Sequence, residues 1–142
     1  WADARFPADC VMAVTFDDTT RRLLDGKNFA VVATLTRDGS PHTATVWYVR
    51  DGDTVLFSTA GHRAKARNLA RDPRVSLTVY DLANPYTAVD IRGTAELEVD
   101  EHRELPVRLS QRYLGEDPPP EPEEVVRLIV RVRPDKVTGF SA

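Results

Sequence analysis

Basic residues gather at the start of a short helix predicted in the middle of the chain. Residues 58–69 read Ser-Thr-Ala-Gly-His-Arg-Ala-Lys-Ala-Arg-Asn-Leu, so two hydroxyls and a glycine precede Arg63 and Lys65. A helix N-terminus favours acidic residues by about 0.3–1 kcal/mol each, and cations there become favourable when a bound anion meets the free N–H groups. Arginine offers two parallel donors and lysine a point charge, which together suit one phosphate group. The segment therefore predicts a phosphate site, with a solvated, arginine-rich surface helix as the alternative.

The other reactive residue types indicate no second chemistry. His42, His62 and His102 share no metal-ligand spacing with one another or with acids, so we expect no metal site. The single cysteine, Cys10, excludes an intrachain disulfide and favours a reducing compartment. No apolar stretch approaches the ~20 residues of a membrane span, and residues 1–14 lack the order of a signal peptide. We expect a cytoplasmic protein with no membrane partner, and the net charge of −3 argues against a nucleic-acid partner.

Turn signals divide the chain into short elements. A chain of 142 residues has the length of one domain with one core. Asp38-Gly39 and Asp51-Gly52 each predict a β-hairpin, and Gly93 within a long strand indicates a bulge or a close backbone approach. We expect strands at 28–35, 43–49, 54–59, 75–79, 86–99 and 125–133, and helices at 17–24, 63–71 and 101–113.

Six strands joined mostly by hairpins, with three short helices, predict an antiparallel barrel. A parallel sheet is disfavoured because only tight turns separate the first strands along the chain. No glycine-rich dinucleotide motif follows a strand, which argues against a Rossmann domain.

The order of these elements is similar to that of the pyridoxamine-phosphate-oxidase-like split barrels, and more narrowly to the branch that uses the deazaflavin coenzyme F420. The resemblance spans about residues 28–99, and the order and spacing of its motifs are more specific than any single one. It implies a mainly β fold, a six-stranded antiparallel split β-barrel of the FMN-binding type with short flanking helices, as one domain over residues 1–142. The segments that carry it are 41–48, 56–59, 63–69, 72–77 and 93–97.

The resemblance also implies which residues bind the cofactor. In that family the phosphate is held by the end of the third strand and by the Arg-x-Lys helix start, and the ring system lies against the first two strands. Trp47 either packs on the ring or buries area between two subunits. Tyr86 takes a place where relatives often carry an aromatic residue near the partner subunit's cofactor, with packing inside its own loop as the alternative. The matching phosphate ligands are Ser58, Thr59, Arg63 and Lys65, and the matching ring neighbours are Ala33, Thr34, Thr45, Val46 and Trp47.

Family membership implies a homodimer with two cofactor sites at its interface, each built from both chains. The sequence supports a covered outer face, because Ala30 and Val32 are apolar opposite the equally apolar Phe29, Val31 and Leu35. A helix of the same chain is the alternative cover.

Three arginines, Arg127, Arg131 and Arg133, share one face of the last predicted strand. We expect a solvated sheet edge there, because charged edges block pairing with other chains. Contact with the acidic tail of a cofactor is the alternative.

The resemblance implies an enzyme, an F420-dependent oxidoreductase that passes a hydride from the reduced deazaflavin to a small electron-poor organic substrate. No residue is identified as catalytic, and Tyr48, Tyr86 and solvent stay open as proton donors. The alternatives are an FMN-dependent oxidase or reductase on the same fold, a non-catalytic module that binds flavin or haem, and a plain interaction protein. A pyridoxamine phosphate oxidase itself is disfavoured, because residues 133–142 lack that enzyme's basic and aromatic substrate motif.

Overall fold

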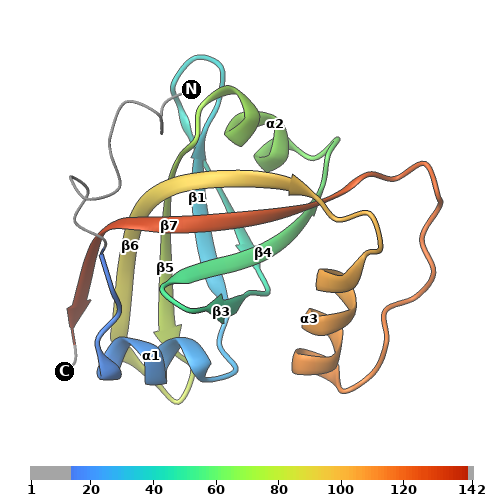
Figure 1. Ribbon diagram of the computed structural model, residues 1–142. Helices are drawn as coiled ribbons and strands as arrows, with labels where there is room; N and C mark the ends of the chain where they lie inside the picture. Colours follow the sequence, from blue (N-terminus) through green and yellow to red (C-terminus); the bar gives the residue numbers. More distant parts are fainter. Residues whose placement is uncertain (1–13, 141–142) are drawn as a thin grey trace.

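Seven antiparallel strands form one sheet in the order β2-β1-β5-β6-β7-β4-β3 (Figure 1). The structure is a computed structural model, and it describes residues 14–140, so Cys10 lies outside the described residues. The strands are β1 (Ala30–Leu35), β2 (Pro41–Val46), β3 (Val49–Asp51), β4 (Thr54–Ala60), β5 (Arg74–Asp81), β6 (Asn84–Val99) and β7 (Arg127–Phe140). The helices are α1 (Asp18–Asp25), α2 (Ala64–Arg71) and α3 (Glu104–Leu114). The prediction of a mainly β, antiparallel split barrel with three short helices is confirmed.

The two edge strands of the sheet, β2 and β3, follow each other in the chain with only Trp47 and Tyr48 between them. Three residue steps span at most about 11 Å, so the two edges must come together and the sheet must curl. Tyr48 is fully buried in the core and fixes this crossing from inside. The strand predicted at 43–49 is therefore two strands, and the sheet has seven strands rather than six.

The barrel interior holds the main hydrophobic core, and a second cluster lies outside it. Figure 1 shows α1 at one end of the barrel, α2 at the other, and α3 beside it. Along β5, Val75, Leu77 and Val79 alternate inward, within the strand predicted at 75–79. The second cluster joins α3 to the outer face of β4, where Leu56 meets the α3 residues; its buried members are Leu56, Leu105, Leu109 and Tyr113.

Side-chain caps set the helix starts. The Asp17 carboxylate accepts from the Thr20 N–H at 2.7 Å, so Asp17, one of the two acids that the sequence offers as a cap, is the N-cap and α1 begins at Asp18, one residue later than predicted. Helix α3 begins three residues later than predicted. The reason is that the buried Asp100 carboxylate accepts from the N–H groups of Glu104 (3.0 Å) and Leu105 (2.9 Å), which leaves the preceding turn outside the helix.

Gly93 marks the register shift between β6 and β7, as predicted for a mid-strand glycine. A Cβ at this position would collide with the backbone carbonyl of Arg133. Pro134 pairs opposite Gly93, where a residue without an N–H fits an interrupted ladder, so β7 continues beyond the predicted end at Arg133.

The prediction of a solvated edge at the last strand is wrong, because β7 lies between β6 and β4. Its arginines instead face acids on neighbouring segments. Arg131 binds Asp51 (2.8 Å) and Arg133 binds Glu96 (2.9 Å), while Arg127 binds Glu121 (2.8 Å). Among residues 14–140, no helix is both long and apolar enough to cross a membrane.

Candidate functional site

A cavity of about 300 Å³ opens where β4, the start of β7, α2 and α3 meet. This volume lies at the lower end of the range of small-molecule pockets, ~300–1,000 Å³. Five of the residues that the sequence predicts for the cofactor line it. They are Thr45, Val46, Trp47, Ser58 and Lys65, and the other lining residues are Pro106, Leu109, Ser110, Pro118 and Arg127.

Strand alternation aims Ser58 into this cavity and Thr59 away from it. Ser58 shares the outer face of β4 with Leu56, which packs against α3, whereas Thr59 is buried on the opposite face with Phe57. The Ser58 hydroxyl oxygen is buried and has no hydrogen-bond partner within residues 14–140. An unpaired buried hydroxyl costs about 1–3 kcal/mol, so this group is suited to a ligand atom placed in the cavity.

Two cations, Lys65 and Arg127, line the same cavity, and Arg63 lies close enough to Lys65 to affect its charge. Burial lowers the pKa of Lys65, and the positive charges of Arg63 and Arg127 lower it further. In the part of the chain that the structure describes, Lys65 forms no ion pair with an acid. Helix α2 has no acidic residue in its first turn, and its N-cap, Arg63, makes no side-chain capping bond. Lys65 and the Ser58 hydroxyl thus border one cavity at the uncapped start of α2, a donor set that fits a phosphoryl group.

One acid stands at the rim of this cationic group. The Glu121 carboxylate accepts from Arg127 Nε (3.0 and 3.1 Å) and from Arg127 Nη2 (2.8 Å). The hydrogen bond from Arg127 lowers the pKa of Glu121, with smaller contributions from the charges of Arg127, Arg103 and His62. Arg63 and Lys65 have no comparable partner within residues 14–140.

An aromatic stack forms the wall beside α3. The Trp47 and Tyr113 rings lie 5.0 Å apart with their planes 5° from parallel, and Phe29 stacks on Tyr113 at 5.6 Å. Trp47 therefore lines the cavity while contacting α3 of its own chain. This arrangement fixes the indole in place without any second subunit.

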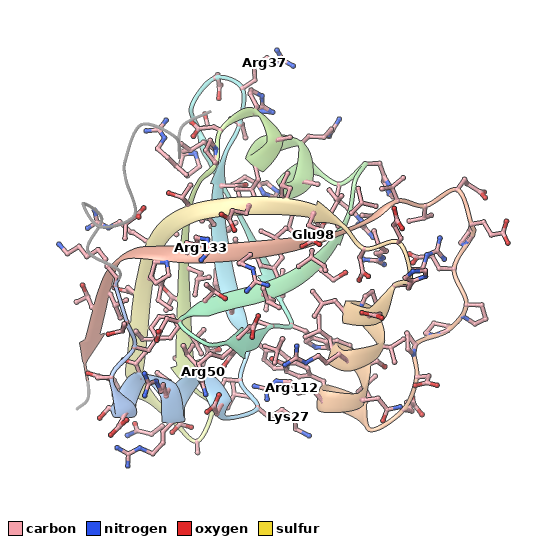
Figure 2. The ribbon with its side chains drawn as sticks, in the orientation of Figure 1. Lys27, Arg37, Arg50, Glu98, Arg112 and Arg133 are labelled. Atoms are coloured by element: carbon pink, nitrogen blue, oxygen red, sulfur yellow. The ribbon has the colours of Figure 1, made fainter. Side chains whose placement is uncertain are left out.

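Arg112 ties α3 to the barrel end where α1 finishes. Its guanidinium donates to the carbonyls of Gly26 (2.7 Å), Leu24 (3.2 Å) and Tyr48 (3.1 Å). Figure 2 shows this side chain reaching from α3 towards the end of α1. The wall of the cavity is thereby held by carbonyls that the helix end would otherwise leave unpaired.

Besides Thr59, three further predicted cofactor residues, Ala33, Thr34 and Tyr86, lie away from this cavity. Ala33 and Thr34 border a second, largely apolar cavity of about 400 Å³ on the outer face of β1, β5 and β6. Thr34 itself is 1% exposed, and its hydroxyl accepts from Asn68 Nδ2 at 3.0 Å. Tyr86 is 69% exposed on the β5–β6 hairpin, at the barrel end opposite α2 (Figure 1). A single chain therefore does not bring these three residues to Lys65.

Tyr48, one of the three proton donors that the sequence left open, is not available to a substrate. Its hydroxyl donates to the Leu24 carbonyl at 2.9 Å, and its side chain is fully buried. Burial raises its pKa above the ordinary value. The Tyr48 hydroxyl therefore stabilises the core and does not donate a proton to a substrate.

Sequence reasoning missed the α3 and loop residues of the cavity and placed Arg127 on a solvated edge. The resemblance weakens beyond residue 99, so no motif marked Leu109, Ser110 or Pro118. For Arg127, the alternative of contact with an acidic cofactor tail was the one signal that pointed towards a ligand.

Comparisons with known proteins converge on one family. Residues 16–140 match the pyridoxamine 5'-phosphate oxidase family. A biliverdin reductase of Mycobacterium tuberculosis (strain CDC 1551 / Oshkosh) that depends on reduced F420 is 29% identical over 131 residues, which cover 86% of this chain and 91% of the relative. The solved structure of an F420 reductase is 30% identical, with a TM-score of 0.77 over 83% of this chain and 94% of that one. A conserved hypothetical protein of Mycobacterium tuberculosis is 25% identical, with a TM-score of 0.72 over 96% and 89%.

Proposed function

This chain belongs to the pyridoxamine 5'-phosphate oxidase family, and we propose that it is a reductase that binds coenzyme F420 and reduces a small electron-poor organic substrate. The similarity to an F420 reductase and to an F420-dependent biliverdin reductase supports an oxidoreductase of this kind.

A buried hydroxyl without a hydrogen-bond partner lies close to cations without an acidic partner, and this observation supports the proposal most directly. The Ser58 hydroxyl and the Lys65 ammonium border one cavity, and Arg63 stands at the N-terminus of α2 beside them. A phosphoryl group has the oxygens that all three donors require. The residues present therefore fit the phosphate of a flavin-like cofactor.

The chain supplies binding and orientation, and the reduced deazaflavin supplies a hydride when bound. Lys65, Arg63 and Ser58 hold the phosphate end. The α3 wall and Trp47 limit the room beside β2, so a flat ring is restricted to the open side of the cavity. Biliverdin, the substrate in the name of the mycobacterial relative, is a tetrapyrrole and belongs among the acceptors to be tested, together with quinones and unsaturated carbonyl compounds.

We propose that the active form of the protein is a homodimer. The second cavity, of about 400 Å³, gives the outer sheet face an apolar depression next to Ala33 and Leu35. A second copy seated on this face would cover it, and the family resemblance assigns the exposed Tyr86 to the neighbourhood of the partner subunit's cofactor. Light scattering on the purified protein is expected to give twice the 15.9 kDa of one chain, and a monomer at micromolar concentration would contradict this part of the proposal.

Fluorescence titration with F420 and with FMN, followed by assays of acceptor reduction, tests the function. Tight F420 binding with turnover of at least one acceptor supports the proposal. Preference for FMN favours the flavin alternative, and binding without turnover of any acceptor favours a storage or sensing module. Absence of binding to either cofactor rejects both enzyme proposals and favours a plain interaction protein.

A further inference from the structure

The ion pair between Glu121 and Arg127 reduces the number of hydrogen-bond donors that the cavity can present to a ligand. Arg127 presents both Nε and Nη2 to the Glu121 carboxylate, at 2.8–3.1 Å. The side chains are 24% and 27% exposed, so neither group is freely hydrated. The planar fork with which an arginine grips a phosphate is therefore already occupied.

The loop holds Glu121 in place. The Arg103 guanidinium donates to the backbone carbonyls of Glu121 (3.0 Å), Pro122 (2.8 Å) and Val125 (2.9 Å). Its charge also lies 3.8 Å from the Glu121 carboxylate. Glu121 is thus a fixed anion beside the cavity rather than a freely moving surface side chain.

The Glu121 carboxylate acts differently on two types of phosphate group. With Arg127 paired, Arg63 and Lys65 are the cations left for a ligand. A phosphodiester, as in F420, carries one negative charge. A terminal phosphomonoester, as in FMN, carries nearly two at neutral pH because its second pKa is about 6. At the same distance the Glu121 carboxylate repels a dianion about twice as strongly as a monoanion. The paired Arg127 cannot offset this repulsion with its donor fork.

Resting on the proposed function, we propose that Glu121 is a specificity-determining residue: by occupying Arg127 it makes the cavity select phosphodiester over phosphomonoester ligands, and hence F420 over FMN. The selection acts through charge, since the carboxylate withholds the donor fork that a dianion would use. Glu121 is a positioning group for Arg127 and needs no contact with the ligand.

The test compares cofactor affinities of Glu121→Gln with those of the parent and of Glu124→Gln, an exposed acid of the same loop without an ion pair within residues 14–140. We expect Glu121→Gln to tighten FMN binding relative to F420 by about tenfold, the effect of one charge-assisted hydrogen bond. Glu124→Gln should leave the ratio unchanged. An equal change for both cofactors, or no change in Glu121→Gln, overturns the inference. Glu121→Asp, which keeps the charge but shortens the reach, should shift the ratio in the same direction by less and serves if the glutamine variant does not fold.

A second readout separates this inference from the identity of the cofactor. Protection against thermal unfolding by inorganic phosphate and by dimethyl phosphate should favour the dianion more strongly in Glu121→Gln than in the parent. The shift should vanish when Arg127→Met is added, because the released fork is then absent. If F420 fails to bind the parent while this anion selectivity still shifts, the proposed function is wrong and the role of Glu121 stands. If the anion selectivity does not shift, the role of Glu121 is wrong whatever cofactor binds.

Discussion

The Trp47 indole lies parallel to the Tyr113 phenol ring, with 5.0 Å between centroids and 5° between planes. This contact joins the two-residue crossing between the sheet edges to α3. The Tyr113 hydroxyl adds a donated hydrogen bond to the Asn28 carbonyl (2.5 Å) and accepts one from the Tyr48 N–H (3.3 Å). Ring and hydroxyl together fix the wall of the cavity that Ser58 and Lys65 line.

Removing only that hydroxyl should weaken the fold while leaving the stack. Tyr113→Phe leaves the buried Asn28 carbonyl without its partner, so we expect the free energy of unfolding to fall by about 1–3 kcal/mol. Urea unfolding measures the change. The exposed Tyr86→Phe is the matched control and should stay within about 0.5 kcal/mol of the parent; equal effects of the two variants would show that the Tyr113 hydroxyl does not hold α3.

Ser58→Ala should move stability and ligand affinity in opposite directions. The substitution removes a buried hydroxyl that has no partner within residues 14–140, so the ligand-free protein should gain about 1 kcal/mol. Cofactor affinity should fall about tenfold because a hydrogen bond to a charged phosphoryl oxygen is lost. Ser110→Ala, at the same cavity, removes a hydroxyl that donates to the Glu116 carbonyl at 2.6 Å and should instead lower stability. Unchanged affinity in Ser58→Ala would place the phosphate elsewhere.

Lys65→Ala and Arg63→Ala should each weaken F420 binding by ~1.5–3 kcal/mol, which is about 10- to 150-fold. Each variant loses one charge-assisted hydrogen bond to the phosphoryl group. Arg67→Ala, an exposed position one turn further along α2, is the control for loss of general positive charge. If Arg67→Ala lowers the affinity as much as the other two, long-range attraction rather than a phosphate site explains the binding.

The lowered pKa of Lys65 predicts opposite pH trends for binding and stability. Affinity for F420 should fall as the pH rises through this pKa, which lies below the ordinary lysine value of 10.5, because the neutral amine no longer attracts the phosphate. In the same window the unfolded chain binds more protons than the folded one, so the stability of the ligand-free protein should rise with pH. Titration and urea unfolding at several alkaline pH values measure the two trends, and Lys65→Ala should flatten both. A pH-independent affinity in the parent would contradict a phosphate contact by Lys65.

Gly93→Ala should destabilise the sheet strongly, because the new Cβ meets the Arg133 carbonyl, a backbone group that cannot rotate away. We expect a loss of at least ~1–3 kcal/mol in urea unfolding. Gly139→Ala on the neighbouring strand meets its nearest atom at 3.9 Å and is the matched control, expected within about 0.5 kcal/mol of the parent. Similar losses in both variants would mean that close backbone approach is not what requires Gly93.

Local features of the fold could be predicted from the sequence because neighbouring residues determine them. Gly39 and Gly52 adopt positive φ in the two predicted hairpins, and Asp17 caps the first helix as expected. Ser58 and Lys65 share one cavity because a strand end and the following helix start are close in the chain. Each of these features depends on a stretch of a few residues.

The order in which the strands pair could not be predicted from short sequence patterns. Nothing near Arg127 in the sequence states that β7 lies between β6 and β4, so its arginines were expected on a free edge. Likewise, the packing of α3 beside Trp47 depends on contacts over more than sixty residues. Long-range pairing reflects the energy of the whole barrel, which no short pattern encodes.

The central position of β7 has a kinetic consequence. It bonds to β6 on one side and to β4 on the other, and the Arg131–Thr54 hydrogen bond links residues 77 positions apart. Closing so large a loop costs chain entropy before the native contacts of β7 can form. Sheets with such long-range pairing therefore refold slowly. After dilution from denaturant, binding of a phosphorylated ligand should therefore return only with the slowest recovery phase, because the cavity is lined by Arg127 only after β7 has paired with β4.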